Sequence, residues 1–409
     1  MRVLLANKFF YRRAGAETVF FRTRELLERH GHEVVDFAMK DERNLASPQR
    51  DMFAPARAYD SGRAHERVRD AAASIYSFNA RRALARVLDT TCPDIAHLHN
   101  IYHQLSLSIV DELAARRIPT VLTVHDYKPV CPSYVLYTEG APCRRCVQGS
   151  PVNAIKHRCV KNSYLPSGLA AIEAVIARRR GTYERIDQFI APSRFFADRL
   201  AEGGVGRGRV TVLANCVSQE PMRPAPDRSP GRYLLYVGRL EELKGVKLLL
   251  DAYRRLGAGC TPLRVLGSGP LEDEVVEAGA QGLPVEFLGF RSGEGVRAEL
   301  GGAIALVVPS LVEENCPMSI LEARELAVPV ISSDRGGLPE VVRDGIDGLV
   351  FAGGDAADLV RCIVELASDP DRARSYGTEG RRRALDEFSS DGYYRGLLDV
   401  YARAVEAAR

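Results

Sequence analysis

Short, continuous runs of valine, isoleucine and leucine alternate with longer helix-like stretches along the whole chain, and this alternation constrains the fold most. Apolar runs that are not interrupted at every second position are typical of strands covered on both faces, as in parallel sheets with helical connections. We therefore predict doubly wound α/β architecture. The predicted strands are 3–6, 34–37, 95–98, 120–124, 188–191, 210–213, 233–237, 263–266, 285–288, 303–308 and 330–332.

The length of the chain and one proline-rich stretch predict two such domains. A chain of 409 residues is too long for one ordinary core, whereas two domains of about 200 residues fit the usual domain size. The stretch 216–231 holds four prolines and few apolar residues, so we predict a linker there. The predicted domains are 1–214, with a cysteine-rich insert at about 128–162, and 215–392.

Composition and charge argue against several classes of protein. Hydrophobic residues make up 46% of the chain and charged residues 27%, as in globular proteins. A net charge of +3 does not indicate nucleic acid as a partner. No apolar run approaches the roughly 20 residues of a membrane span, and the apolar start is too short for a signal peptide. We expect a cytoplasmic protein, and the three arginines 178–180 offer contact with the inner face of the membrane as the alternative to a solvated helix end.

Two glutamates, Glu314 and Glu322, flank the most informative loop of the chain. A strand-like run precedes Glu314, and a helix-like run at 319–326 contains Glu322. The amides of 315–319 would then lie at a helix N-terminus, which favours bound phosphate. A phosphate cradle between two carboxylates that bind hydroxyls suits a sugar nucleotide.

Arg239 and Lys244 follow another predicted strand through Gly238. Two cations at that strand end would neutralise a diphosphate, the arginine through directed bonds and the lysine as a point charge. Two solvated basic residues on a loop are the alternative. The first strand-to-helix loop, 7–17, lacks the full G-x-G-x-x-G pattern, so a nicotinamide cofactor is not favoured.

Histidines stand at the ends of two predicted strands of the first domain. His125 is placed for catalysis or for binding a hydroxyl, and Asp126 is placed to orient it. We predict His99 as a cleft residue on the acceptor side and His97 as a core residue. A structural histidine remains the alternative for His125.

Four of the nine cysteines lie within one insert, in the order C-x11-C-x2-C-x12-C. A C-x2-C pair places two thiolates on one turn, and two further thiolates complete a tetrahedral zinc site. His157 is an alternative ligand, and four unrelated reduced thiols are the alternative to a metal site. We expect a structural zinc. The predicted ligands are Cys131, Cys143, Cys146 and Cys159.

An ordered set of short motifs resembles the family-4 retaining glycosyltransferases of the GT-B fold, in which two Rossmann-like domains face a cleft. The resemblance covers most of the chain, and the cysteine insert is similar to one branch of the family. The motifs are Thr123-Val-His-Asp126, Ala191-Pro-Ser-Arg194, Val237-Gly-Arg239 with Lys244-Gly245, Leu266-Gly-Ser-Gly-Pro270, Phe287-Leu-Gly-Phe290, Pro309-Ser310, the Glu314/Glu322 pair and Gly336-Gly-Leu-Pro-Glu340.

The resemblance assigns roles to individual residues. It implies that Arg239 and Lys244 bind the diphosphate, that Glu322 binds the ribose and that Glu314 lies near the donor sugar. It places His125 beside the reacting sugar. Further donor contacts implied by the resemblance are Gly15, near the phosphates, Phe290 and Arg291, near the base, and the backbone of Cys316, Pro317, Met318 and Ser319, near the sugar and distal phosphate.

The implied function is retaining transfer of a sugar from a UDP- or GDP-sugar to a hydroxyl of a sugar, a lipid-linked saccharide or a small aglycone. Bacterial polysaccharide, glycolipid or natural-product synthesis is the implied context. The resemblance implies no catalytic metal, and it implies that a last helix at 393–409 joins the N-terminal domain. Asn315-Cys-Pro-Met318 stands where relatives often carry glycines, so the donor sugar does not transfer with the resemblance. A sugar-nucleotide epimerase of the same fold and a non-catalytic zinc-containing binding protein remain alternatives.

Overall fold

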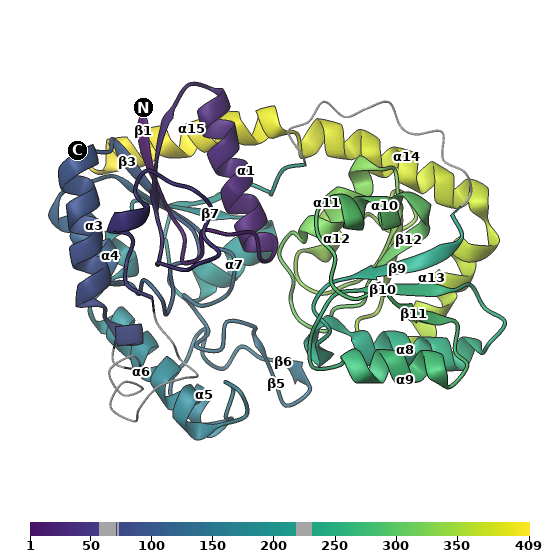
Figure 1. The fold of residues 1–409 in the computed structure, drawn as a ribbon. Helices are drawn as coiled ribbons and strands as arrows, with labels where there is room; N and C mark the ends of the chain where they lie inside the picture. The colour runs from purple at the N-terminus through teal and green to yellow at the C-terminus, as the bar shows by residue number, and fades with distance from the viewer. Residues whose placement is uncertain (57–70, 72, 218–230) are drawn as a thin grey trace. The chain divides into compact units, whose positions relative to one another are not determined.

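The structure, a computed structural model, describes residues 1–56, 71, 73–217 and 231–409. The chain divides into two compact units (Figure 1). The first unit is Met1–Ala214 with Tyr393–Arg409, and the second unit is Asn215–Gly392. Most of the predicted linker, 218–230, lies outside the described residues.

The first unit is built on a six-stranded parallel sheet with the strand order β2-β1-β3-β4-β7-β8. Three successive residues of its strand β1, Val3, Leu4 and Leu5, are 0% exposed, so the strand is covered on both faces, as its continuous apolar run predicted. The strands are β1 (Arg2–Ala6), β2 (Glu33–Phe37), β3 (Ile95–Leu98), β4 (Thr120–Thr123), β7 (Gln188–Ala191) and β8 (Val210–Val212).

Helices connect these strands and pack on the sheet. An insert between β4 and β7 carries a short antiparallel hairpin, β5 (Tyr137–Thr138) with β6 (Ala141–Pro142), and the short helix α5 (Asn153–Lys156). Further helices among the described residues are α1 (Gly15–Arg29), α3 (Phe78–Thr91), α4 (Ser108–Ala115), α6 (Tyr164–Arg179), α7 (Arg194–Glu202) and α15 (Ser390–Ala407), which belongs to this unit from Tyr393 onward, with 3-10 turns at Arg50–Met52 and Tyr183–Arg185.

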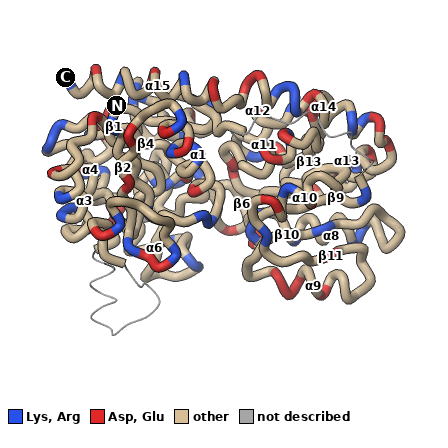
Figure 2. Tube along the Cα trace, turned by 45° about the horizontal axis from the view of Figure 1, so that its top comes forward, with Lys and Arg blue, Asp and Glu red and all other residues tan. Residues whose placement is uncertain are grey.

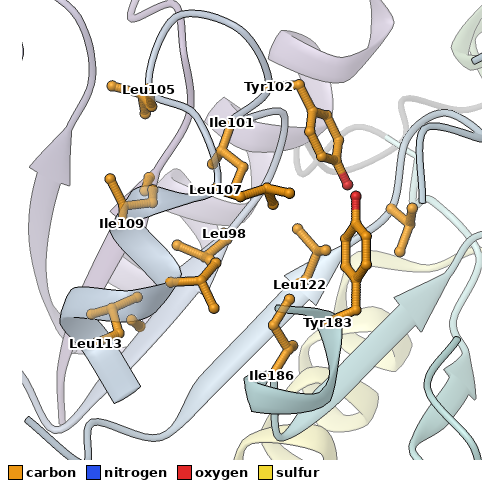
Figure 3. Packing of buried hydrophobic residues seen from close by; sticks show 14 of the residues in the cluster. Leu98, Ile101, Tyr102, Leu105, Leu107, Ile109, Leu113, Leu122, Tyr183 and Ile186 are labelled. Atoms are coloured by element: carbon orange, nitrogen blue, oxygen red, sulfur yellow. The ribbon is translucent and has the colours of Figure 1, made fainter. Parts of the chain in front are cut away.

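The core of the first unit fills the space between the sheet and its helices. Figure 3 shows Leu98 of β3, Leu122 of β4 and Ile109 of α4 in one buried apolar cluster. In the same view the hydroxyls of Tyr102 and Tyr183 point toward each other at the edge of the apolar cluster. Sequence-distant segments therefore share one core, as expected for a doubly wound sheet.

The second unit has its own six-stranded parallel sheet, in the order β11-β10-β9-β12-β13-β14. Counted along the chain this is the order 3-2-1-4-5-6 of Rossmann-type domains. The sixth strand was not predicted from the sequence. The strands are β9 (Tyr233–Val237), β10 (Leu263–Leu266), β11 (Val285–Phe287), β12 (Ala303–Val308), β13 (Val330–Ser333) and β14 (Gly348–Phe351).

The helices of the second unit follow its strands in the βα alternation that the sequence predicted. They are α8 (Val246–Leu256), α9 (Glu272–Ala280), α10 (Glu294–Gly302), α11 (Met318–Glu325), α12 (Leu338–Val341), α13 (Ala356–Ser368) and α14 (Pro370–Glu387), and a 3-10 turn, Glu242–Lys244, precedes α8. Basic and acidic residues are interspersed along both units (Figure 2). Within the described part of the chain, no helix is long and apolar enough to cross a membrane.

Candidate functional site

The candidate site of the second unit lies at the carboxyl ends of β9 and β12. These two strands are neighbours in the sheet, and Leu306 pairs with Leu235. The strand order reverses between them, and at such a switch point the loops at the carboxyl ends leave a crevice in which ligands bind. Arg239 and Lys244 follow β9, and Glu314 follows β12, so the topology brings these predicted residues to one edge of the sheet.

Tight backbone contact holds the loop after β9 in place. The hydroxyl of Tyr236 donates to the carbonyl of Arg239 at 2.7 Å. Gly245 has a φ of +77°, and a Cβ at this position would lie 1.8 Å from the carbonyl oxygen of Pro309. Only glycine therefore fits here, and the close approach seats Lys244 against the loop that carries Glu314.

An ion pair joins the two loops. Lys244 Nζ lies 2.5 Å from Glu314 Oε1, and Ser310 Oγ donates to the same oxygen at 2.5 Å. Burial raises the pKa of Glu314, but the Lys244 ammonium, the Ser310 hydroxyl and Arg239 outweigh it, so that the pKa lies below its usual value. Glu314 is therefore a carboxylate at neutral pH. The sequence analysis missed the part of Ser310, although it noted the Pro309-Ser310 motif.

The Gly336-Gly337 pair fixes the backbone of Glu314. The amide of Gly337 donates to the carbonyl of Glu314 at 2.7 Å, and Gly336 forms a bridge with the same residue. Gly336 has a φ of +67°, and a Cβ there would lie 2.3 Å from the Glu314 carbonyl oxygen. These glycines thus set the position from which the Glu314 side chain meets Lys244.

Helix α11 begins at Met318, directly after Pro317, and carries Glu322, which is partly exposed, near its middle. Cys316 and Met318 are 3% and 7% exposed, so their side chains pack inward, and the carbonyl of Cys316 accepts from Asn215 Nδ2 at 2.8 Å. The amides at the start of α11, which include Ser319, belong to the positive end of the helix dipole.

A buried arginine anchors α11. Arg324, two residues after Glu322, is 1% exposed and lies 2.7 Å from Asp347 Oδ1. Arg383 of α14 contacts the other oxygen of Asp347 at 3.3 Å. A buried charge network of this kind holds one orientation of the helix, because each charge depends on its partners.

The two residues predicted near the base lie after β11. Phe290 is 63% exposed, so its ring is available for stacking on a planar ligand. Arg291 pairs with Glu299 at 2.5 Å, and Glu299 also pairs with Arg264. The structure therefore holds Arg291 through an acidic partner that the sequence analysis did not identify.

A chain of histidines forms the candidate site of the first unit. His125 Nε2 lies 2.9 Å from His99 Nδ1, and the two rings stack with centroids 5.2 Å apart. Behind them, His97 bonds to Tyr401 of α15 at 2.9 Å and to Thr123 at 2.7 Å. Burial and the Lys8 ammonium lower the pKa of His125 to about 4, so the imidazole is neutral at neutral pH.

The structure buries His99, the residue predicted on the acceptor side. This residue is 1% exposed, because it lies behind His125 and against the ring of Phe20. Its side chain contacts the ring of His125, and its role on the acceptor side stays a prediction. His97, 0% exposed, is a core residue, as predicted.

Charged groups gather beside His125 at the start of α1. Burial lowers the pKa of Lys8 and raises the pKa values of Glu17 and Asp126, and Lys8 opposes both of these increases. Buried groups with shifted pKa values cluster at functional sites. The predicted Gly15 is the first residue of α1. Lys8 was not predicted, although its place just after the first strand was a usable signal.

The predicted orientation of His125 by Asp126 is not what the structure shows. Asp126 Oδ1 accepts from the backbone amide of Lys128 at 3.0 Å, whereas His99 bonds to the His125 ring. A histidine from the neighbouring strand end therefore contributes to the position of His125.

The four cysteines of the insert line one small cavity. All four are free thiols, and Cys131 and Cys146 are buried. His157, the alternative ligand, pairs with Glu139 at 2.9 Å. Among the residues that the structure describes, no group of three or more His, Cys, Asp or Glu side chains has the arrangement needed to hold a metal ion.

Comparison with known proteins gives two family matches. A model described as Glycosyltransferase Family 4 matches residues 13–220, just over half of the chain. A second model, described as Glycosyl transferases group 1, matches residues 231–369. The first match ends six residues after Ala214, the last residue of the first unit before the division.

Individual proteins are similar over different shares of the chain. The alpha-maltose-1-phosphate synthase of Mycolicibacterium smegmatis is 28% identical over 344 residues, which are 76% of this chain and 79% of that protein. The putative colanic acid biosynthesis glycosyltransferase WcaL of Salmonella typhimurium is 28% identical over 231 residues, 53% of this chain and 57% of its own length. The crystal structure of Anabaena HepE in complex with UDP and glucose superposes with a TM-score of 0.67 at 16% identity, covering 98% of this chain and 99% of HepE.

Proposed function

Because the chain belongs to glycosyltransferase family 4, we propose that it moves a sugar from a UDP- or GDP-sugar to an acceptor hydroxyl with retention at the anomeric carbon. The observation that supports this proposal is the ion pair between Lys244 and Glu314. It lies at the switch point of a sheet whose strands have the order 3-2-1-4-5-6. A cation for the diphosphate and a carboxylate for sugar hydroxyls stand side by side where such folds bind nucleotides.

The chemistry follows from the charges that develop in the reaction. Cleavage of the bond between the anomeric carbon and the diphosphate oxygen leaves positive charge on the sugar and negative charge on the diphosphate. Lys244, Arg239 and the first amides of α11 would stabilise the leaving group electrostatically. The acceptor oxygen forms the new bond on the same face, and its proton passes to the departing phosphate oxygen, so no covalent enzyme intermediate is required.

Lys244 and Ser310 both contact Oε1 of Glu314. We therefore assign Oε2 to a hydroxyl of the donor sugar. Glu322 takes the ribose hydroxyls, and Phe290 with Arg291 takes the base. In the first unit, His125 is the residue assigned to the reacting sugar, and it acts as a neutral hydrogen-bonding group because its pKa is about 4.

The two named relatives and the structural neighbour support a saccharide context. WcaL is named for colanic acid biosynthesis, and HepE was crystallised with UDP and glucose. We propose a bacterial polysaccharide or a related glycoside as the product, with a sugar or lipid-linked saccharide as the acceptor.

The test is a panel of UDP- and GDP-sugars offered with simple sugar and alkyl-glycoside acceptors, with released nucleoside diphosphate as the readout. We expect one donor to be consumed in an acceptor-dependent way. Glu314→Gln should abolish that turnover, and Glu242→Gln, a change at a well exposed position of the 3-10 turn before α8, should not. Conversion of a donor to an isomeric sugar nucleotide without acceptor would instead identify an epimerase and refute the proposal.

A further inference from the structure

The insert between β4 and β7 brings four cysteines from three separate segments to one cavity. Cys131 precedes the β5–β6 hairpin, Cys143 and Cys146 follow it, and Cys159 follows α5. The cavity measures about 10 Å³, which is close to the space that a single water occupies. That size suits an ion and excludes an organic ligand.

The local backbone presents the middle two thiols as a pair. The amide of Cys143 donates to the carbonyl of Leu136 at 2.7 Å, and the amide of Val147 donates to the carbonyl of Arg144 at 3.0 Å. The first bond ties the turn to the hairpin, and the second closes the turn around Cys146. Paired cysteines two residues apart on such a turn are the usual half of a tetrahedral thiolate site.

The backbone of the insert is strained where the cysteines lie. Of the eleven non-glycine residues with positive φ in the described chain, six fall within 134–162. Left-handed backbone at residues other than glycine persists only where surrounding structure enforces it. Small segments without a core of their own usually obtain that support from disulfides or metal ions, and all four cysteines are free.

Polar and charged neighbours suit thiolates. Ser133 Oγ lies 3.3 Å from the sulfur of Cys131, and Thr138 Oγ1 lies 3.7 Å from that of Cys159. Hydroxyls at these positions donate to the sulfurs once the thiols are deprotonated. The segment also carries several cations, which would oppose the double negative charge of a four-thiolate zinc centre. They are Arg144, Arg145, Lys156, Arg158 and Lys161.

We propose that Cys131, Cys143, Cys146 and Cys159 bind one structural Zn²⁺ as four thiolates, with release of their protons. The four cysteines line one cavity but form no metal-binding group in the described structure, so zinc binding requires their side chains to turn inward about χ1. His157 is not a ligand, because it does not line the cavity and bonds to Glu139 instead.

The zinc site also braces the segment that follows His125. The amide of Cys131 donates to the carbonyl of Tyr127 at 2.7 Å. Lys128 of the same segment forms a buried ion pair with Glu173 of α6 at 2.7 Å. An ion that fixes Cys131 therefore fixes the loop between His125 and the insert, which is a positioning role rather than a catalytic one.

Elemental analysis of the purified full chain, freed of any affinity tag, tests the proposal independently of glycosyl transfer. We expect one zinc per chain in the wild type. Cys143→Ser/Cys146→Ser should lose it, and the matched control Cys92→Ser/Cys260→Ser, changed at two cysteines outside the insert, should keep it. Zinc retained by the first variant would overturn the assignment.

A second readout serves if the serine variant does not fold. Titration of the wild type with a mercurial thiol reagent, followed with a chromophoric chelator, should release one zinc per chain, and Co²⁺ in its place should show the absorption of tetrahedral cobalt thiolate. Wild-type protein that neither contains zinc nor binds Zn²⁺ or Co²⁺ under reducing conditions would refute the proposal, as would iron in place of zinc.

Discussion

Replacement of Lys244 by alanine should lower catalysis far more than stability. Its ammonium lies 2.5 Å from a carboxylate on a loop held by Gly245, so it is a preorganised charge. Two unit charges about 4 Å apart interact by roughly 4 kcal/mol at an effective dielectric constant of about 20. Loss of one such contact to a leaving diphosphate should lower kcat/KM by about 10²- to 10³-fold.

The cost to stability should be much smaller. The side chains of Lys244 and Glu314 are 26% and 15% exposed, and only fully buried pairs lose the 3–5 kcal/mol that follows removal of one partner, so we expect about 1–2 kcal/mol. This corresponds to a decrease in Tm of roughly 2–8 °C. Thermal unfolding and initial-rate assays on the same preparation measure the two effects together.

Two further variants make the test sharper. Lys247→Ala, at a half-exposed lysine with partners at 3.5 Å and 3.9 Å, should leave both kcat/KM and Tm nearly unchanged. Lys244→Ala/Glu314→Gln removes the unpaired carboxylate and should recover most of the lost Tm without recovering turnover. The reasoning would be refuted if Lys244→Ala kept more than about a tenth of the wild-type rate, or if the double variant regained activity along with stability.

Two other predictions concern stability. Burial holds the pKa of His97 at about 3 and, with Lys8, that of His125 at about 4, below the roughly 6.5 of an unfolded chain. Between these folded-state and unfolded-state pKa values the unfolded chain binds more protons, so stability should fall as pH falls from about 6.5 toward 4. His125→Asn should flatten the dependence of Tm on pH. An unchanged slope of Tm against pH in this variant would contradict the reasoning. Asp347→Asn leaves the buried Arg324 without its counter-charge and should lower the free energy of unfolding in urea by about 3–5 kcal/mol, whereas Asp371→Asn, at a side chain 92% exposed, should change it by less than about 0.5 kcal/mol.

Sequence patterns predicted the fold well where the physics is local. Continuous apolar runs such as Val3–Ala6 are stable when covered on both faces, and the structure confirms a parallel sheet there. The strand Gly348–Phe351 escaped prediction because it is short and begins with glycine, which weakens both the periodicity and the β-propensity that identify a strand.

The candidate site was less predictable because its partners come from distant segments. Glu314 and Lys244 were identifiable as residues at strand ends, but their pairing across 70 positions depends on the order of strands in the sheet, which the apolar runs do not specify. The same holds for His99, whose burial behind His125 follows from the neighbouring positions of β3 and β4. The Gly336-Gly337 contact with Glu314 likewise exists only in the folded sheet.

The configuration of the transferred sugar tests the central claim most directly. The measurement is the one-bond NMR coupling constant between the anomeric carbon and its proton. It is read early in the reaction, on the product formed from the accepted nucleotide sugar. The account predicts a glycoside with the same anomeric configuration as the donor, formed together with one nucleoside diphosphate and absent with Lys244→Ala. An inverted glycoside would contradict the same-face mechanism, and no transfer from any UDP- or GDP-sugar would contradict the assigned function.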